Sequence, residues 1–368
     1  MKSKKKIKVM HFVSGFKNGG VEQVLLNYTK LLNKNYNDNI ENIIVYQHTA
    51  DPEKLRMSKK IGNRMIEIPA KRDGIFRHMY VTYKLLKSER PAIVHAHMSL
   101  TSFVPLSVAA FLGIRVRIAH SHIAQDEFNP HIIPLLKKLN ILFATNLLAC
   151  GKKAGNYMYG NRKFDILYNA IDQSKYEYRP EWREEIRNQY HIPPNSVVLG
   201  TIGRVVKQKN QKFLIDIFDS YNKIHKDSYL FIVGDGELSD DLNSYIDSKK
   251  SKDKIIRINA VKSTEKLYSA FDVFLMPSLY EGLPVVAIEA QASGIPTLLS
   301  NNIDESVVFS DKVDMLSIDQ GIKPWVKKLQ VLENRKSDRK FQGNSNYDIE
   351  VQNKRLFNFY LNCMRKDK

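Results

Sequence analysis

The chain has 368 residues, of which 43% are hydrophobic, and a formal net charge of +18. This length exceeds what a single hydrophobic core usually serves, so we expect two domains, and the apolar content excludes a disordered chain. Cys150 and Cys363 lie far apart and outside any metal or redox motif, so we expect reduced thiols in a cytoplasmic protein. No apolar run has the length of a membrane-spanning helix, and the lysine-rich start leads directly into a strand, unlike a signal peptide.

The positive charge is concentrated in the first half of the chain. Residues 1–170 hold 27 Lys and Arg against 11 Asp and Glu, a balance of +16, whereas residues 171–368 hold 30 against 28. Basic surfaces bind nucleic acid, anionic lipid headgroups or phosphorylated substrates. A genome-wide preference for lysine is the plain alternative, although such a preference would spread the charge over both halves.

The first half alternates between apolar strands and amphipathic helices. This β-α-β repetition predicts a parallel sheet in an N-terminal domain of residues 1–171. A polar segment with three prolines, residues 172–195, is predicted to be a linker. The strands of the first domain are predicted at 7–13, 42–46, 65–68, 92–97, 116–120 and 146–150.

The same pattern starts again after the linker and defines a second domain, residues 196–345. A last helix, within residues 346–368, is expected to pack back toward the first domain. The fold class is therefore α/β, with two doubly wound Rossmann-like domains facing a cleft. The strands of the second domain are predicted at 197–203, 229–233, 255–258, 273–276 and 297–299.

Gly19 and Gly20 open a helix directly after the first strand. Glycine allows a ligand to approach the backbone, and a helix N-terminus offers N–H groups to a phosphate or a sugar. A plain tight turn explains the two glycines equally well. The spacing differs from G-x-G-x-x-G, so a nicotinamide cofactor is not expected.

Two histidine pairs stand at the ends of strands. His120 and His122 end one strand, and His95 and His97 end another. Residues two apart on a strand point the same way, so each pair could hold zinc, but no third ligand at metal spacing lies nearby in the sequence. We expect His120 or His122 to face a sugar, with a structural role as the alternative for His95 and His97.

The loop after the first strand of the second domain is rich in cations. Gly203 and Arg204 end the strand, and Lys207 and Lys209 follow before a helix. Arg204 can bind an oxyanion through two parallel hydrogen bonds, and Lys209 adds a point charge. We interpret these two as diphosphate ligands and Lys207 as a surface residue.

The segment Gly234-Asp235-Gly236-Glu237 lies between a strand and a helix. The two acids resemble a divalent-metal motif, but acids at a helix start need no metal. A helix cap is the favoured interpretation.

Glu281 and Glu289 form the most informative pattern in the chain. Glu281 follows a buried strand and a Pro-Ser turn, and Glu289 lies in an apolar helix. A glutamate among apolar residues is normally paired or binding something. The carboxyl edge of a parallel sheet is where ligands bind, so the pair suits a substrate with hydroxyls and an anionic group, such as a nucleotide sugar.

At these motifs the chain resembles the retaining nucleotide-sugar glycosyltransferases of the GT-B fold, family 4, over nearly its full length. The resemblance rests on Gly19-Gly20-Val21-Glu22, on Gly203-Arg204 with Lys209-Asn210, on Gly234-Asp235-Gly236, and on the Glu281…Glu289 pair in its Glu-Gly-Leu-Pro context. The segments 117–122 and 149–160 are most similar to the capsular and exopolysaccharide branch. Residues 259–261 depart from the family at a position where glycine is common near the base, which leaves the base open.

This resemblance implies a role for each candidate residue. Glu281 contacts the donor sugar, Glu289 the ribose, and Arg204 and Lys209 the diphosphate. His122 corresponds to the active-site histidine of the first domain, with His120 as its neighbour. The further binding positions are Gly19, Gly20, Gly203, Gly282 and Leu283, the last two through backbone N–H groups at a helix start.

The implied function is transfer of a sugar, with retention, from a UDP-sugar to a hydroxyl of a lipid-linked or glycan acceptor in capsule or exopolysaccharide synthesis. No cofactor and no metal are expected. The basic first domain predicts peripheral binding to an anionic membrane, on the cytoplasmic face of the cell membrane. A sugar-nucleotide epimerase of the same architecture is one alternative. A nucleic-acid-binding protein is the other, but the first half has no known nucleic-acid-binding motif.

Overall fold

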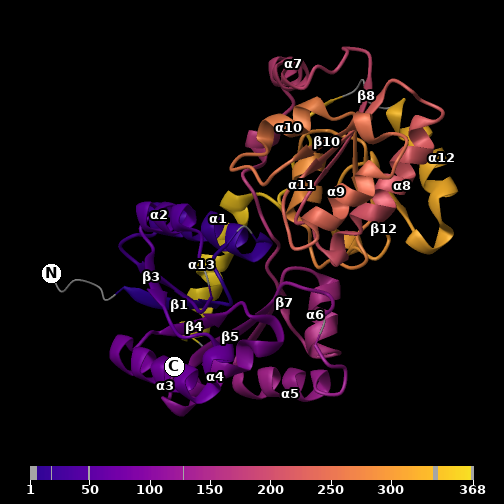
Figure 1. Cartoon of the computed structure of the whole chain (residues 1–368). Coiled ribbons are helices and arrows are strands. Elements are labelled where there is room, and N and C mark those ends of the chain that lie inside the picture. Colours follow the sequence, from indigo (N-terminus) through magenta and orange to yellow (C-terminus); the bar gives the residue numbers. More distant parts are fainter. Residues whose placement is uncertain (1–5, 18, 49, 127, 335–338, 366–368) are drawn as a thin grey trace. The chain divides into compact units, whose positions relative to one another are not determined.

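A computed structural model describes residues 6–17, 19–48, 50–126, 128–334 and 339–365. The chain divides into two compact units (Figure 1). The first unit comprises Met1–Ala170 together with Ile349–Lys368, and the second comprises Ile171–Asp348. Each unit is a Rossmann-like α/β domain built on a parallel sheet, which confirms the predicted fold class.

The first unit is built on a seven-stranded sheet in the order β3-β2-β1-β4-β5-β6-β7, whose pairs are parallel. The order reverses between β1 and β4, which makes their carboxyl ends a topological switch point. The strands are β1 Ile7–Val13, β2 Ile40–Tyr46, β3 Arg64–Glu67, β4 Ile93–Ala96, β5 Val116–Ser121, β6 Asn146–Ala149 and β7 Asp165–Ile166. The helices are α1 Gly20–Asn35, α2 Pro52–Lys60, α3 Ile75–Glu89, α4 Phe103–Phe111, α5 Ile133–Phe143, α6 Lys152–Tyr159 and α13 Ile349–Arg365, with short 3₁₀ helices η1 Lys71–Asp73 and η2 Ser99–Ser102.

The C-terminal helix α13 packs in the first unit, beside α1. The rings of Tyr36 and Phe357 stack with centroids 3.8 Å apart, and the side-chain amide of Asn353 donates to the Tyr28 carbonyl at 2.8 Å. The last helix therefore completes the domain formed by the first half of the chain.

The second unit has a six-stranded sheet in the order β10-β9-β8-β11-β12-β13, again with parallel pairs. Here the order reverses between β8 and β11. The strands are β8 Val197–Ile202, β9 Ser228–Val233, β10 Ile255–Ile258, β11 Val273–Met276, β12 Thr297–Ser300 and β13 Val313–Leu316. The helices are α7 Pro180–Gln189, α8 Gln211–Asn222, α9 Ser239–Asp247, α10 Glu265–Ala270, α11 Val285–Ala292 and α12 Ile322–Glu333, with 3₁₀ helices η3 Gln173–Tyr176, η4 Lys207–Lys209, η5 Lys252–Lys254, η6 Glu305–Val307 and η7 Ile318–Gln320.

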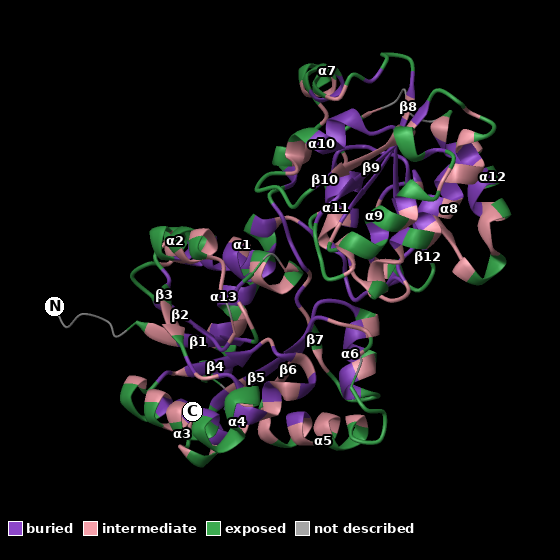
Figure 2. Ribbon diagram, viewed as in Figure 1, coloured by how far each residue is buried: buried purple, intermediate pink, exposed green. Residues whose placement is uncertain are grey.

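Burial explains why the strands are continuous apolar runs. All four residues of β11 are buried, because helices cover both faces of a parallel sheet (Figure 2). On one face, Phe218 of α8 and Trp325 of α12 belong to the same buried cluster as Leu199 and Leu275 of the sheet. This packing fixes the strand ends from which the site loops leave.

The segment predicted to be a linker is part of the second unit. It contains η3 and the helix α7, which packs against α10. Pro180 lies in the first turn of α7, where its missing N–H costs nothing, so the proline that suggested a linker starts a helix. Arg187 of α7 is buried and its guanidinium binds the Asp272 carboxylate at 2.7 Å. The polar composition reflects an exposed helix face and not an extended chain.

Among the described residues, no helix combines the length and the apolarity needed to cross a membrane.

Candidate active site

The loops that follow β8 and β11 lie side by side at the switch point of the second sheet. Three hydrogen bonds join them. The Leu279 amide donates to the Gln208 carbonyl at 2.8 Å, and the Gln208 side chain donates to the Tyr280 carbonyl at 2.9 Å. The Asn210 side chain donates to the Pro277 carbonyl at 3.2 Å. The cationic loop and the loop that carries Glu281 are therefore held in one arrangement.

Lys209 and Glu281 meet where these loops join. The Nζ atom of Lys209 lies 2.7 Å from Oε1 of Glu281, and Glu281 is only 8% exposed. Gly203 leaves the space for this contact, since a Cβ atom there would lie 3.2 Å from Cε of Lys209. The structure thus brings together Gly203, Lys209 and Glu281, three residues that the sequence predicted for one site.

Arg204 and Lys207 lie on the same loop with exposed side chains. The Arg204 carbonyl accepts a hydrogen bond from the Gln211 side chain at 2.7 Å, which fixes the backbone and leaves the guanidinium free to reach a ligand. An arginine beside an ion-paired lysine can bind a diphosphate through several hydrogen bonds.

Gly234 and Gly236 are required by close backbone packing against the cationic loop. Gly234 has φ of +129°, and a Cβ atom on it would lie 2.1 Å from the Gly203 carbonyl oxygen. A Cβ atom on Gly236 would lie equally close to the Val205 carbonyl oxygen. The two glycines therefore position the Gly203–Val205 backbone by allowing the β9 loop to lie directly on it.

The helix-cap interpretation of this segment is wrong. Helix α9 begins at Ser239, and its cap residue Leu238 makes no side-chain cap hydrogen bond. Asp235 instead accepts a hydrogen bond from the Ala260 amide at 2.7 Å. The carboxylate ties together the loops that follow β9 and β10, which are neighbouring strands.

Glu289 is held between two tyrosine hydroxyls inside the second unit. Tyr176 of η3 donates to Oε1 at 2.8 Å, and Tyr268 of α10 donates to Oε2 at 2.6 Å. Burial raises the pKa of the Glu289 carboxyl from 4.5 to about 7, and the two tyrosine hydrogen bonds act in the opposite direction. Sequence reasoning missed both tyrosines, because they lie 113 and 21 residues away from Glu289.

The start of α11 differs slightly from the prediction. Gly282 and Leu283 are buried loop residues, and the helix begins at Val285 after Pro284. A residue before proline avoids the helical conformation, which explains why the helix cannot start at Leu283. No side chain caps α11. The backbone N–H groups at the helix start therefore come from Val285 and Val286, three residues later than expected.

In the first unit, Gly19 and Gly20 form the start of α1. Gly19 is the cap residue in an extended conformation. A Cβ atom on Gly20 would contact nothing within 4 Å, and one on Gly19 would meet only the flexible end of Glu22. Packing against the rest of this unit therefore requires neither glycine, and their role in ligand binding stays a prediction.

The two histidine pairs meet a fifth histidine, His11 of β1, on one face of the first sheet. His11, His95 and His120 lie on the adjacent strands β1, β4 and β5, and His97 and His122 directly follow β4 and β5. His11 is in register with His95. The ring nitrogens form short contacts, 3.2 Å between His11 Nδ1 and His97 Nε2, and 2.9 Å between His97 Nδ1 and His122 Nε2. We call the five residues the histidine cluster: His11, His95, His97, His120 and His122.

The cluster corrects the expectation that no third ligand lies near either pair. Two triads, His11 with His95 and His97, and His97 with His120 and His122, have nitrogens within 4.8 Å of one another. Burial lowers the pKa of His122 and of His11 to about 4, and those of the other three rings fall well below 6.5. His120 is 3% exposed and His122 is 8% exposed.

Comparison with known proteins shows which families the chain is similar to. Residues 182–347, most of the second unit, match the model of the family described as glycosyl transferases group 1. Three relatives agree over larger parts of the chain. They are the glycosyltransferase EpsF of Bacillus subtilis (28% identical, 86% of this chain and 85% of the relative), the UDP-Gal:alpha-D-GlcNAc-diphosphoundecaprenol alpha-1,3-galactosyltransferase of Escherichia coli (29%, 60% and 60%), and the capsular polysaccharide biosynthesis glycosyltransferase CapH of Staphylococcus aureus (24%, 96% and 99%).

The solved structure of Anabaena HepE, in complex with UDP and glucose, has the same fold. It superposes with a TM-score of 0.80, with 17% identity over 96% of this chain and 99% of the other. The two Rossmann-like units are therefore those of a GT-B fold. The family match of residues 182–347 and the names of the relatives support a glycosyltransferase.

Proposed function

We propose that this chain is a glycosyltransferase that transfers a sugar from a UDP-sugar to a hydroxyl of a lipid-linked or glycan acceptor in capsule or exopolysaccharide synthesis. The observation that carries the proposal is the Lys209–Glu281 pair at the switch point of the second sheet. Parallel sheets bind nucleotides at such a point. A cation, a buried carboxylate and an uncapped helix start together suit a diphosphate joined to a sugar.

Each donor group has a proposed partner. Arg204 and Lys209 bind the diphosphate, with the start of α11 as a third source of positive potential. Glu281 accepts hydrogen bonds from the sugar hydroxyls. Glu289 accepts from the ribose, with Tyr176 and Tyr268 fixing the direction of its carboxylate.

The proposed reaction retains the anomeric configuration and needs no metal. The bond between the anomeric carbon and the diphosphate oxygen breaks, and its electron pair stays on the diphosphate. The acceptor oxygen bonds to the anomeric carbon from the face that the diphosphate leaves, and its proton passes to a diphosphate oxygen. Fixed positive groups stabilise the growing charge, typically by about 3 kcal/mol for each donor. Arg204 and Lys209 would thus stabilise the charge that other enzymes stabilise with a divalent metal ion.

Relatives support the nature of donor and acceptor. HepE has been solved with UDP and glucose, and the Escherichia coli relative is named for a UDP-galactose donor and a diphosphoundecaprenol-linked acceptor. CapH is named for capsular polysaccharide biosynthesis. We therefore propose a polyprenyl-diphosphate sugar as the first acceptor to test.

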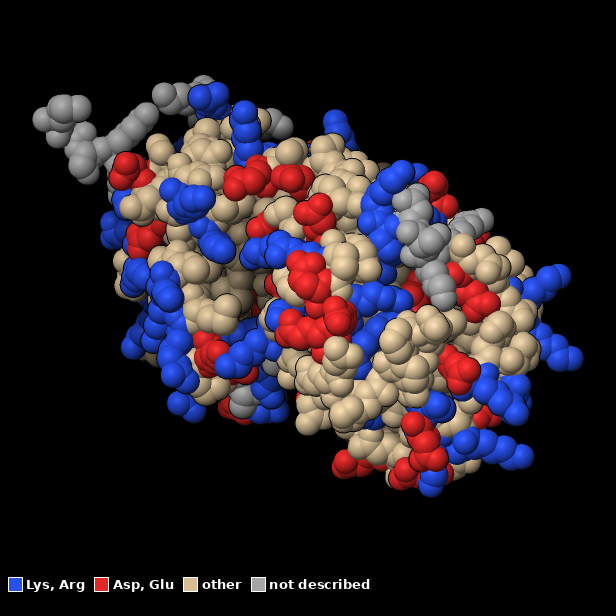
Figure 3. Space-filling view, turned by 90° about the horizontal axis from the view of Figure 1, so that it is seen from above, with Lys and Arg blue, Asp and Glu red and all other residues tan. Residues whose placement is uncertain are grey.

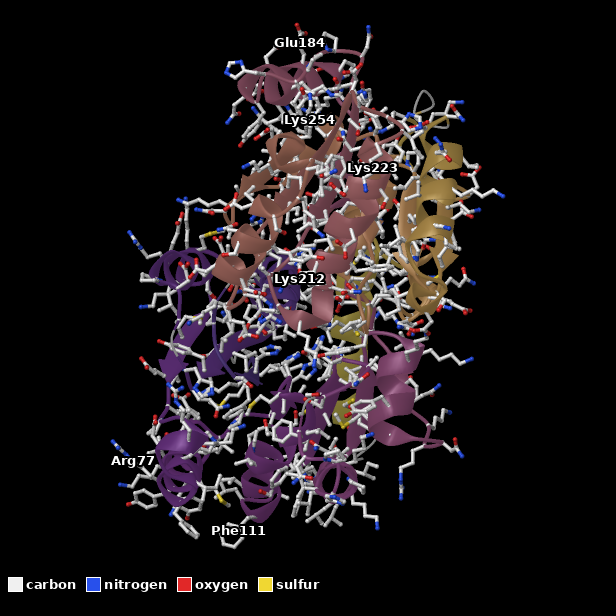
Figure 4. All side chains as sticks on the ribbon, turned by 45° about the vertical axis from the view of Figure 1, so that its right-hand side comes forward. Arg77, Phe111, Glu184, Lys212, Lys223 and Lys254 are labelled. Atoms are coloured by element: carbon white, nitrogen blue, oxygen red, sulfur yellow. The ribbon has the colours of Figure 1, made fainter. Side chains whose placement is uncertain are left out.

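A lipid-linked acceptor requires the enzyme to reach a membrane, and one surface of the first unit suits this. Helices α3, α4 and α5 pack together and expose large apolar side chains, among them Phe76, 85% exposed, and Phe111, 82% exposed. In Figure 4 the exposed Arg77 of α3 and Phe111 both lie at the lower end of the first unit. We call this surface the α3–α5 face: Ile75, Phe76, Met79, Tyr80, Phe111, Leu135 and Leu142 with Arg77, Lys84, Lys87 and Lys138.

Apolar side chains surrounded by cations are typical of a surface that lies on an anionic bilayer. We propose that the α3–α5 face binds the cytoplasmic face of the cell membrane. Residues 171–368 are nearly balanced in charge, and on the face that Figure 3 shows, Lys and Arg are interspersed with Asp and Glu.

Product analysis tests the function. The purified enzyme is incubated with a panel of UDP-sugars, with and without a polyprenyl-diphosphate sugar, and products are identified by mass spectrometry and proton NMR. A new α- or β-linkage that matches the donor anomer, formed only with acceptor, supports the proposal. Conversion of the donor sugar without acceptor would establish the epimerase instead. A mobility shift with nucleic acid at physiological salt would favour the nucleic-acid-binding alternative.

A further inference from the structure

The histidine cluster continues into two amide side chains, of which Asn42 is buried and Asn33 is partly buried. His11 Nε2 lies 3.1 Å from Asn42 Oδ1, and Asn42 Nδ2 donates to Asn33 Oδ1 at 2.8 Å. Asn33 Nδ2 donates to the Ile61 carbonyl at 2.8 Å. Together with His97 and His122, these residues form an unbroken line of polar contacts, which we call the amide–histidine chain: Asn33, Asn42, His11, His97 and His122.

The direction of hydrogen bonding is fixed at the amide end. A backbone carbonyl only accepts, so the Asn33 side chain must direct its nitrogen to Ile61 and its oxygen to Asn42. The contact between Thr29 and Asn63 leads to the same orientation of the Asn33 amide. Thr29 donates its hydroxyl proton to the Leu25 carbonyl at 2.8 Å and therefore accepts from Asn63 Nδ2.

Asn63 links that second contact to the chain. With its nitrogen on Thr29, its oxygen faces Asn33 and accepts from Asn33 Nδ2 at 2.8 Å. Both contacts therefore place the Asn33 oxygen toward Asn42. Asn42 must then present its own oxygen to His11.

The rings of the chain are neutral at pH 7. Burial lowers the pKa of His11 and His122 to about 4 and that of His97 well below 6.5. A neutral imidazole carries one N–H and one lone pair, so fixing one nitrogen fixes the other.

The direction of the hydrogen bond at one ring determines the direction at the next ring. Because Asn42 Oδ1 accepts, His11 carries its proton on Nε2 and has a lone pair on Nδ1. His97 must then donate from Nε2 to His11 and accept at Nδ1. His122 in turn donates from Nε2 to His97, which leaves the lone pair of His122 on Nδ1.

We propose that the Asn33–Asn42 pair acts through His11 and His97 to hold His122 in the Nε2–H tautomer, with Nδ1 as a hydrogen-bond acceptor. The role of this tautomer in sugar transfer rests on the proposed function, in which His122 belongs to the active site. In this state His122 can accept a hydrogen bond from a hydroxyl at Nδ1 and cannot donate one there to a phosphate oxygen.

A metal ion in either triad would require a different arrangement. It would take lone pairs that the chain uses as acceptors, and it would place a charge among buried neutral groups. The amide–histidine chain explains the His11–His97 and His97–His122 contacts as hydrogen bonds with one proton each. We therefore favour this hydrogen-bonded arrangement over a bound metal ion.

The tautomer can be read directly in the free enzyme. Long-range ¹H–¹⁵N NMR of histidine-labelled protein distinguishes Nδ1–H from Nε2–H rings, and His122→Gln assigns the His122 signals. We expect wild-type His122 to be wholly Nε2–H. Asn42→Leu, which removes the acceptor that faces His11 Nε2, should populate both tautomers. Asn140→Leu, which removes a buried amide bonded to the Leu100 carbonyl elsewhere in the unit, is the matched control.

An Nδ1–H or mixed His122 in the wild type would overturn the proposal without need of any variant. So would an unchanged His122 signal in a folded Asn42→Leu protein, or stoichiometric zinc that shifts the histidine signals when removed by a chelator. The NMR measurement needs no donor or acceptor. An enzyme that shows the expected tautomer but transfers no sugar would therefore contradict the proposed function without contradicting the proposed tautomer of His122.

Discussion

Lys209 Nζ lies 2.7 Å from Glu281 Oε1, so the cation proposed for the diphosphate and the carboxylate proposed for the sugar are bound to each other before any donor arrives. The pair keeps a nearly buried carboxylate compensated in the free enzyme. Donor binding would give Lys209 a second anionic partner and Glu281 a set of hydroxyl donors. The two residues therefore form one unit with two functions.

Replacing Glu281 by glutamine is expected to reduce kcat for transfer by about 100-fold or more. The amide keeps the shape of the side chain but loses the charge that orients Lys209 and accepts from sugar hydroxyls. Initial rates of sugar transfer measure the effect, and thermal unfolding verifies the fold. Glu185→Gln is the control, because Glu185 forms an exposed ion pair with Lys266 in the same unit. Normal turnover in Glu281→Gln would remove Glu281 from the site.

Glu289 predicts a specific dependence of stability on pH. Its pKa is about 7 in the folded protein and close to 4.5 when unfolded, so the folded state holds the extra proton between these values. Stability should therefore fall as pH rises from 4.5 to 7, by an amount on the order of 3 kcal/mol from this group.

Urea unfolding at several pH values checks this, with tryptophan fluorescence as the signal. The two tryptophans, Trp182 and Trp325, both lie in the second unit and report its unfolding. Glu289→Gln should flatten the curve between pH 4.5 and 7. Parallel curves for the variant and the wild type would show that Glu289 titrates normally.

Asp272 should be essential for the stability of the second unit. Its carboxylate binds Arg183 and Arg187 of α7, each at 2.7 Å, and accepts from the Val198 amide at 2.7 Å. Burial raises the pKa of Asp272, but the two arginines outweigh it and the pKa falls below 3.8. Asp272→Asn leaves Arg187 buried and uncompensated, so we expect a loss of about 3 kcal/mol or more.

The same fluorescence measurement tests this, at pH 7. Lys266→Met breaks the exposed Lys266–Glu185 pair between α10 and α7 and should cost less than about 1 kcal/mol. Equal losses in the two variants would contradict the buried role of Asp272.

The α3–α5 face should determine binding to anionic vesicles. The double variant Phe76→Ser and Phe111→Ser is expected to weaken binding at least about tenfold, because both side chains lose their burial in the lipid interface. Arg77→Glu should weaken vesicle binding more at low salt than at high salt, because salt screens the attraction between the cation and the anionic lipid. Sedimentation with vesicles measures both effects, against Ile224→Ser and Lys223→Glu in the second unit as controls. Unchanged sedimentation of the face variants would exclude this surface.

The sequence predicted the sheets and the loops at their carboxyl ends because these signals are local. Apolar runs such as 273–276 show the strands, and the β-α-β alternation implies that their ends share an edge. The meeting of Lys209 and Glu281 follows from that order, because their strands are neighbours in the sheet.

The partners of these residues could not be predicted, because they depend on packing between distant segments. Tyr176 lies in the segment interpreted as a linker, and the polar face of α7 concealed a helix that binds Asp272. The histidine cluster needs the register of β1 against β4 and β5, which no spacing within one strand reveals. The repeat of two His-x-His pairs at strand ends was the available signal.

Calorimetric titration with UDP tests the central claim, that the switch point of the second sheet holds the donor diphosphate. The wild type should bind UDP, and Lys209→Met should bind it at least about tenfold more weakly, a difference of about 1.4 kcal/mol. Lys212→Met, which removes an exposed lysine of α8 paired with Asp241, should bind UDP like the wild type. Equal affinity of the wild type and a folded Lys209→Met enzyme would contradict the claim.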